Sequence, residues 1–332
     1  MNYILFGAGS AGRYAVRHLV SKGIHPCGFA DNDTSKWGCG IEGLRVEGPT
    51  TCHKMYPEAT WVATAISRPA APEIRKQIKE MGVKTAPLWE VLPVCHGLPP
   101  KAVQKTIAHL LNDKESLEEW CDQYVFREQP DYDLQRGPSP KEEIYFPDFI
   151  THLDGEHFID CGAADGDTVK EFRKLWTDYG SIIAFEPDPS NYKTLAEGNL
   201  HDGRMLAIKA AICDHKDTVS FAANGDYSSH IGAGSTKVQT YTLDGLNLDP
   251  IPTYIKMDIE SSELEALWGA RHLLYEHKPV LAICAYHTSE HLWQIPLLIH
   301  AIQPEYRLFL RRYAEGAFEL VWYAVPPERV NK

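Results

Sequence analysis

Residues 158–168 read Phe-Ile-Asp-Cys-Gly-Ala-Ala-Asp-Gly-Asp-Thr, an apolar run followed by a glycine-containing turn. The apolar residues before it predict a buried strand at 157–161, and Thr168 opens a segment with helical spacing at 168–176. Between them, Gly162 and Gly166 let the backbone turn sharply. A glycine turn that joins a strand to a helix predicts a doubly wound α/β sheet, with a ligand bound at the turn.

The same alternation of strands and helices continues on both sides of this stretch. Strands are expected at 3–6, 26–30, 60–65, 84–88, 157–161, 182–186, 206–212, 254–259 and 280–286. Helices are expected at 168–176, 190–199, 262–275 and 289–301, and others begin near Ala11 and Ala71. This order predicts two Rossmann-like doubly wound sheets. Two late segments, 306–311 and 318–325, follow one another without a helix and predict an antiparallel hairpin at the edge of the second sheet.

Composition restricts the class of protein. The chain has 332 residues, 44% apolar and 23% charged, as expected for a globular protein of two domains. Its formal charge of −12 disfavours a nucleic-acid partner. No apolar run is long enough to span a membrane, and the N-terminus lacks the pattern of a signal peptide, so we expect a cytoplasmic protein. The eight cysteines include no C-x-x-C pair, which favours buried, reduced thiols over zinc or disulfides.

Charge and proline content mark a connector between the domains. Residues 113–154 hold 4 bases and 12 acids, and several prolines lie in their second half. We therefore expect a Rossmann-like domain at 1–94, an acidic connector at 95–150 that contains one amphipathic helix and a Pro-rich part, and a second domain at 151–332.

The first domain begins with a second glycine motif, G-x-G-x-x-G, between a strand and a helix. An acidic residue follows the next strand, where it can hold ribose hydroxyls. The residues expected to bind a nucleotide are Gly7, Gly9, Ser10, Ala11, Gly12 and Asp31. The alternative is that these glycines only permit close packing of the helix on the strand. No catalytic pair follows the motif, which weakens the interpretation as an NAD-dependent oxidoreductase or epimerase.

The second domain has an acid at the corresponding place, Glu186, after its second strand. Asp160 adds a negative charge beside the glycine turn, and Ala211 and Ile212 end the third strand, where an adenine can rest. This acidic first motif and its glycine spacing fit S-adenosylmethionine (SAM) better than NAD. The residues expected to bind it are Asp160, Gly162, Ala163, Asp165, Gly166, Thr168, Glu186, Pro187, Ala211, Ile212 and Asp258.

Residues 145–325 resemble the FkbM family of SAM-dependent methyltransferases. The resemblance rests on four ordered motifs: 158–168, Phe-Glu-Pro-Asp-Pro at 185–189, Thr-Leu-Asp-Gly-Leu at 242–246, and Ile-Lys-Met-Asp-Ile-Glu-Ser-Ser-Glu-Leu at 255–264. It implies a class I methyltransferase fold, SAM as methyl donor, and O-methylation of a hydroxyl, often on a sugar or polyketide. Ser261 stands where the family often has glycine, so a backbone with positive φ would be strained there.

The first 85 residues resemble, more loosely, the N-terminal domains of nucleotide-sugar-modifying proteins such as sugar acetyltransferases and polysaccharide-biosynthesis dehydratases. The matching pieces are Gly7–Gly12, Gly-Phe-Ala-Asp-Asn-Asp at 28–33 and Leu-Arg-Val-Glu-Gly-Pro at 44–49. This resemblance implies a nucleotide or nucleotide-sugar ligand.

Two residues are candidates for deprotonating the acceptor hydroxyl. Asp258 and His287 both follow strands, so both are expected at the same carboxyl edge. One hypothesis makes His287 the general base and Asp258 its orienting partner; an alternative gives both to a divalent metal that holds a sugar diol. Glu263 and Glu265 are expected to favour the helix N-terminus. Arg311 and Arg312 are expected to be solvated on an edge strand, with a phosphate contact as the alternative.

The sequence therefore predicts a SAM-dependent O-methyltransferase acting on a sugar or glycoconjugate hydroxyl. The alternatives left open are the oxidoreductase or epimerase, and a nucleotide-binding protein with an inactive methyltransferase domain. A small-molecule or glycan substrate is expected, and the sequence leaves a homo-oligomer open.

Overall fold

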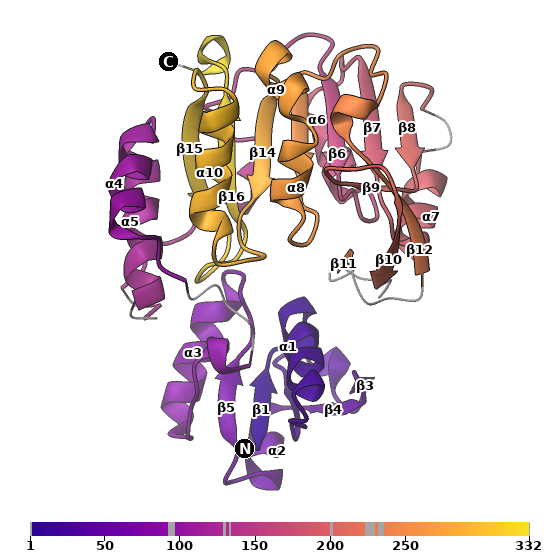
Figure 1. Ribbon diagram of the computed structural model, residues 1–332. Coiled ribbons are helices and arrows are strands. Elements are labelled where there is room, and N and C mark those ends of the chain that lie inside the picture. Colours follow the sequence, from indigo (N-terminus) through magenta and orange to yellow (C-terminus); the bar gives the residue numbers. More distant parts are fainter. Residues whose placement is uncertain are drawn as a thin grey trace. The chain divides into compact units, whose positions relative to one another are not determined.

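The computed structural model describes residues 2–91, 97–128, 131–132, 134–199, 202–222, 230–231 and 236–331 (Figure 1). The chain divides into two compact units. Unit 1 holds residues 1–95 and 314–318, and unit 2 holds residues 96–313 and 319–332. The described residues of the expected connector therefore belong to unit 2 and form no third body. Both units are built on α/β sheets made mostly of parallel strands, which confirms the predicted fold class.

Unit 1 is a small sheet with the strand order β3-β4-β2-β1-β5. All of its pairings are parallel except the one between β3 and β4. Its elements are β1 (Tyr3–Phe6), α1 (Ser10–Ser21), β2 (Gly28–Ala30), β3 (Gly40–Ile41), β4 (Leu44–Glu47), α2 (Pro49–Met55), β5 (Thr60–Ala63) and α3 (Ala70–Met81). The strand expected at 84–88 is reduced to a single bridge between Thr85 and Trp61. Pro87 explains this result, because it has no N–H to donate to a ladder.

Unit 2 contains a seven-stranded sheet with the order β15-β16-β14-β13-β6-β7-β8. Its strands are β6 (His157–Cys161), β7 (Ser181–Phe185), β8 (Met205–Ile208), β13 (Tyr254–Met257), β14 (Val280–Cys284), β15 (Arg307–Arg312) and β16 (Leu320–Val325). The first five are parallel, and β15 and β16 form the predicted antiparallel hairpin. The strand order reverses between β6 and β13. In such sheets, ligands bind beyond the carboxyl ends of the strands at this switch point.

Helices cover both faces of the large sheet. The helices of unit 2 are α4 (Lys101–Leu110), α5 (Lys114–Glu128), α6 (Asp167–Leu175), α7 (Pro189–Glu197), α8 (Glu263–Trp268), α9 (Arg271–His277) and α10 (His291–Ile302). Buried residues of α4, α5, α8, α9 and α10 share one core cluster, and α8 and α10 lie in front of the sheet in Figure 1. Residues of α6 and α7 share the cluster on the other side. Each face of the sheet therefore has its own apolar core.

Two segments that were expected to be continuous are divided. The helix expected at 262–275 breaks between α8 and α9 at Gly269, where a Cβ would lie 2.2 Å from the carbonyl oxygen of Cys213. The strand expected at 206–212 ends at Ile208, and Ala211–Ile212 forms β9 of a separate sheet ordered β11-β10-β12-β9. The other strands of that sheet are β10 (Thr218–Ala222), β11 (His230–Ile231) and β12 (Thr236–Tyr241), and the sequence analysis missed all three.

The expected solvation of Arg311 and Arg312 is wrong. Helix α5 packs along β15, so both side chains are buried. Arg311 Nη2 lies 2.5 Å from Asp113 Oδ2, and Arg312 Nε donates to Glu119 Oε1 over 2.9 Å. These acids of the connector thus neutralise the arginines, and the connector covers the edge of the sheet that was expected to be bare.

Two further findings concern membrane-spanning helices and cysteines. Among the described residues, no helix combines the length and apolarity that a membrane crossing requires. The seven cysteines of the described part are all free thiols, but Cys39 and Cys121 are exposed, contrary to the expectation of burial. Cys95 lies outside the described residues.

Candidate functional site

The glycine turn after β6 lies at the switch point of the large sheet. Gly162 and Gly166 both have left-handed backbones, with φ of +80° and +86°. A Cβ on Gly162 would lie 1.9 Å from the carbonyl oxygen of Asp258, which follows the neighbouring strand β13. Glycine is therefore required at 162 because two adjacent strand ends touch. The contact joins the predicted cofactor turn directly to the predicted catalytic residue.

Asp160 and Lys256 form a buried ion pair beneath this turn. Lys256 Nζ lies 3.0 Å from Asp160 Oδ1 and donates to the Gly162 carbonyl over 2.7 Å. Burial alone would lower the pKa of Lys256, but the charges of Asp160 and Asp258 hold it above its usual value. Asp160 is fully buried, and this burial raises the pKa of its carboxyl while the charge of Lys256 opposes the shift. The pair supports the turn from below, and contact between this carboxylate and a cofactor stays a prediction.

Glu186 lies at the carboxyl end of β7, as predicted, and is almost wholly buried. Its Oε2 accepts a hydrogen bond from Ala164 N over 2.8 Å, and its Oε1 accepts one from Asp188 N over 2.8 Å. Burial raises the pKa of Glu186 to about 7 even though these two N–H groups oppose the shift. The side chain is therefore held rigidly against the glycine turn.

The other predicted cofactor residues surround the turn at different depths. Ala163 and Thr168 are buried, and Asp165 and Pro187 are partly exposed. The Oδ1 atom of Asp165 is buried without a hydrogen-bond partner among the described residues. An unpartnered buried oxygen fits a site that takes up a donor from a ligand. Together with the left-handed glycines and Glu186, it makes this turn compatible with SAM.

Ala211 and Ile212 lie in β9, and their side chains are buried. Ile212 belongs to the apolar core between the sheet and α8–α10, and Ala211 packs with Phe221 and Val238 of the small sheet. Their expected contact with an adenine remains a prediction.

Asp258 and His287 come together as the sequence predicted. His287 Nε2 lies 3.2 Å from Asp258 Oδ1, and Tyr145 Oη donates to Asp258 Oδ2 over 2.9 Å. Burial would raise the pKa of Asp258, but His287 and Lys256 hold it well below its usual value. Burial likewise opposes the charged form of His287, yet Glu263 and Glu260 raise its pKa well above 6.5. At neutral pH the pair is therefore an imidazolium beside a carboxylate.

Sequence reasoning missed the role of Glu263. This residue begins α8 as expected, but it is completely buried, and its Oε1 lies 2.8 Å from His287 Nδ1. Its Oε2 lies 3.3 Å from His291 Nδ1, so one carboxylate separates the two histidines. The signal was present in the spacing Asp-x-Glu-x-x-Glu at 258–263, which places three acids around one strand end. Glu265, by contrast, is exposed, in agreement with a purely helical role.

Tyr145 is a second missed residue, and it comes from the expected connector. It has a left-handed backbone with φ of +69°, and Tyr323 Oη accepts a hydrogen bond from its N–H over 3.0 Å. Tyr286 Oη also approaches Asp258 Oδ1, at 3.3 Å. Two tyrosine hydroxyls therefore hold the Asp258 carboxylate.

The glycine motif of unit 1 is explained in part by packing. A Cβ on Gly12 would lie 2.0 Å from the Gly7 carbonyl oxygen, which supports the packing alternative at this position. Asp31 accepts a hydrogen bond from Ala8 N over 2.8 Å and lies 3.2 Å from Lys36 Nζ. Gly9 and Ser10 are exposed, and Ala11 is partly exposed. A nucleotide at this motif stays a prediction, because Asp31 already binds its own loop.

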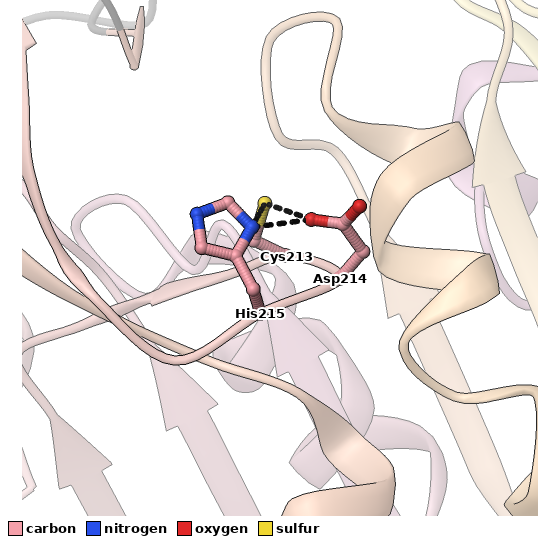
Figure 2. Close-up of side chains that lie close together, drawn as sticks. All are labelled: Cys213, Asp214 and His215. Atoms are coloured by element: carbon pink, nitrogen blue, oxygen red, sulfur yellow. Dashed lines mark hydrogen bonds and ion pairs between the residues drawn. The ribbon is translucent and has the colours of Figure 1, made fainter.

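A separate cluster of polar side chains follows β9 (Figure 2). Asp214 Oδ1 lies 3.3 Å from Cys213 Sγ and 2.5 Å from His215 Nδ1. The three residues are consecutive, and a bend in the chain brings their side chains together. Asp214 and His215 are exposed, and their polar atoms satisfy one another, so the cluster is explained as a surface hydrogen-bonded turn.

Two solved structures are similar to this chain to different extents. Methyltransferase FkbM from Methylobacillus flagellatus KT is 21% identical, with a TM-score of 0.71 over 97% of this chain and 89% of its own. UDP-D-quinovosamine 4-dehydrogenase from Vibrio fischeri is also 21% identical but has a TM-score of 0.22 over 26% of this chain and 75% of its own. A comparison with curated proteins gave no significant match.

The first of these structures supports the methyltransferase fold of the chain. The family comparison covers the glycine turn, Glu186, Asp258 and His287 in one continuous match. Residues 160–314 match the methyltransferase FkbM domain, and the chain therefore carries a domain of the FkbM methyltransferase family.

Proposed function

We propose that the chain is a SAM-dependent O-methyltransferase that acts on a hydroxyl of a sugar or glycoconjugate. The observation that carries this proposal is the contact between Gly162 and the Asp258 carbonyl, which joins the cofactor turn to the Asp258–His287 pair. The family match at 160–314 supports the class of reaction. The choice of a hydroxyl as acceptor rests on the carboxylate and imidazole, which are suited to moving a proton.

The turn residues and Glu186 would hold SAM. When bound, SAM supplies a methyl group on a sulfonium, already activated for in-line displacement. The chain's task is then mainly to align the acceptor oxygen, since alignment alone accounts for much of such a barrier. The rigid contacts of Glu186 with Ala164 and Asp188 suit that purpose.

The proton of the acceptor hydroxyl would go to the Asp258–His287 pair. Of the two, Asp258 is the acceptor that the geometry favours, because its carboxylate is ionised and 22% exposed. His287 is held as an imidazolium between Asp258 and Glu263, so it has no free lone pair for a further proton. This refines the hypothesis of His287 as general base: its role becomes that of a cation that positions Asp258 and balances its charge.

Calorimetry with SAM and S-adenosylhomocysteine tests the proposal first. Wild-type protein should bind both, and Glu186→Ala should bind neither tightly; absence of binding by the wild type would contradict the assignment. Methyl transfer from radiolabelled SAM to a panel of nucleotide sugars and glycosides then tests the acceptor class. Asp258→Asn should lose transfer, whereas Glu265→Gln, an exposed change on the same segment, should alter neither SAM affinity nor transfer.

Unit 1 would have a binding role in this function. Its glycine loop and the resemblance to nucleotide-sugar-modifying proteins suit a domain that helps to hold a nucleotide-linked substrate. Calorimetry of the full chain with UDP-sugars tests this role. A Cβ at position 9 would have no atom within 4 Å, so Gly9→Trp should weaken the binding of UDP-sugars without unfolding the domain. Unchanged binding in this variant would remove the role.

A further inference from the structure

His287 occupies an unusual position among three acids. Its side chain is 5% exposed, and its Nε2 atom is buried without a well-aligned hydrogen bond to any residue that the structure describes. Yet Nε2 lies 3.2 Å from Asp258 Oδ1 and 3.7 Å from Glu260 Oε2. A buried nitrogen that lies near two carboxylate oxygens without a well-aligned hydrogen bond to either fits a site where a cation is shared by the three side chains.

The other ring nitrogen is fixed. Glu263 Oε1 lies 2.8 Å from His287 Nδ1, and the same oxygen accepts a hydrogen bond from Ile259 N over 3.0 Å. Metal-binding histidines typically donate their second N–H to a carboxylate in this way, which orients the ring and makes the free nitrogen a better ligand. Glu263 is completely buried, so it is well placed for this supporting role.

Charge supports the same conclusion. Asp258, Glu260 and Glu263 surround one imidazole, and the nearby Lys256 is paired with Asp160. Even with His287 protonated, the group carries an excess of negative charge. Carboxylate oxygens and one imidazole nitrogen suit cations such as Mn²⁺ and Mg²⁺, whereas a structural zinc site usually has four nitrogen or sulfur ligands.

We propose that Asp258 Oδ1, Glu260 Oε2 and His287 Nε2 form a binding site for a divalent cation, with Glu263 as the carboxylate that orients His287. A cation that binds there replaces the Nε2 proton of the imidazolium, and that proton is released to solvent. Three protein ligands leave coordination positions open to oxygen atoms. If the proposed function holds, those positions would take the acceptor hydroxyl and a neighbouring one, so the cation would orient a diol and acidify it. The site lies at the carboxyl ends of β13 and β14.

Binding of Mn²⁺ to the metal-free 332-residue chain tests the site, by calorimetry and by electron paramagnetic resonance of free Mn²⁺. One Mn²⁺ should bind per chain. Glu260→Gln and His287→Ala should each weaken binding by at least about tenfold, and Glu263→Gln by about 10–100-fold. Glu260 is partly exposed, so its variant should fold normally, which circular dichroism checks.

Two variants serve as controls. Glu265→Gln changes an exposed acid of the same helix, and His215→Ala disrupts the polar cluster of Figure 2; both should bind Mn²⁺ like the wild type. No Mn²⁺ binding by the wild type, or equal affinity in Glu260→Gln and Glu265→Gln, would overturn the proposal. Binding of SAM is measured separately in the presence of EDTA. If Mn²⁺ does not bind but SAM does, the cation site is wrong and the methyltransferase assignment is unaffected. If SAM does not bind but Mn²⁺ does, the methyltransferase assignment is wrong and the cation site is unaffected.

Discussion

Glu186 gives the sharpest test of the cofactor site, because its ionisation can be followed through SAM affinity. We expect its carboxylate to accept hydrogen bonds from the ribose hydroxyls of SAM, and only the ionised form has both oxygens available as acceptors. Burial raises the pKa of Glu186 to about 7. The protonated form, which binds weakly, therefore dominates below neutrality, and the affinity for SAM should rise with pH up to about this value.

The size of the effect follows from that pKa. A carboxyl with a pKa of about 7 is roughly nine-tenths ionised at pH 8 and roughly one-tenth ionised at pH 6, which is about a tenfold difference or ~1.4 kcal/mol. We therefore expect the association constant for SAM to fall by about tenfold between pH 8 and pH 6. The N–H groups of Ala164 and Asp188 stay bonded to the carboxylate throughout, so the fold near Glu186 should not change.

Isothermal titration calorimetry at pH 6, 7 and 8 measures this dependence in wild type and in Glu186→Gln. The variant should bind SAM more weakly at pH 8 and should lose the pH dependence that belongs to Glu186. Glu197→Gln is the matched control, because Glu197 is an exposed acid of α7, and it should behave like the wild type. An identical pH slope in Glu186→Gln and wild type would show that Glu186 is not the titrating group, because SAM's own titration would then account for the slope.

Three other substitutions test the architecture of the site by urea denaturation. Gly162→Ala should lower the free energy of unfolding by more than ~2 kcal/mol, since the left-handed backbone costs ~1–2 kcal/mol and the new Cβ would meet the Asp258 carbonyl. The control is Gly203→Ala, whose Cβ would enter open space and which should change the free energy of unfolding by less than about 0.5 kcal/mol. Similar losses in both variants would contradict the contact between Gly162 and Asp258. Lys256→Met should cost about 3–5 kcal/mol because it leaves Asp160 buried without a partner, and adding Asp160→Asn should recover part of this loss. If the double variant is no more stable than Lys256→Met, loss of the ion pair is not the cause of the lower stability. Ser261→Gly should raise the free energy of unfolding by up to ~1 kcal/mol because glycine adopts φ of +82° without strain. An unchanged urea midpoint of unfolding would argue against strain at this residue.

Much of the large sheet could be predicted from sequence, for a definite physical reason. Strands β6, β13 and β14 are buried on both faces, so they are continuous apolar runs that stand out from their surroundings. The glycine turn could be predicted because Gly162 and Gly166 adopt a left-handed backbone that other residues rarely adopt. Asp258 and His287 could be paired because both follow parallel strands, whose carboxyl ends share one edge.

The remaining features depend on contacts that no local pattern contains. The small sheet has two-residue strands, β9 and β11, which are too short to give a period. Tyr145 is 113 residues from Asp258, and its hydrogen bond exists only because the connector folds back onto unit 2. For the same reason the acidity of 113–154 was assigned to a connector between the domains, although Asp113 and Glu119 neutralise buried arginines.

The strained turn after β13 and the acidic cluster have a common origin. Glu260 and Ser261 are consecutive left-handed residues, with φ of +52° and +82°. Each costs roughly 1–2 kcal/mol without glycine, so other contacts must hold this backbone in place. Its effect is to turn the chain between β13 and α8 so tightly that Asp258, Glu260 and Glu263 all face His287. An unstrained connection would need more residues and would place these acids farther from His287. The strained backbone therefore occurs where the proposed chemistry needs three carboxylates around one imidazole.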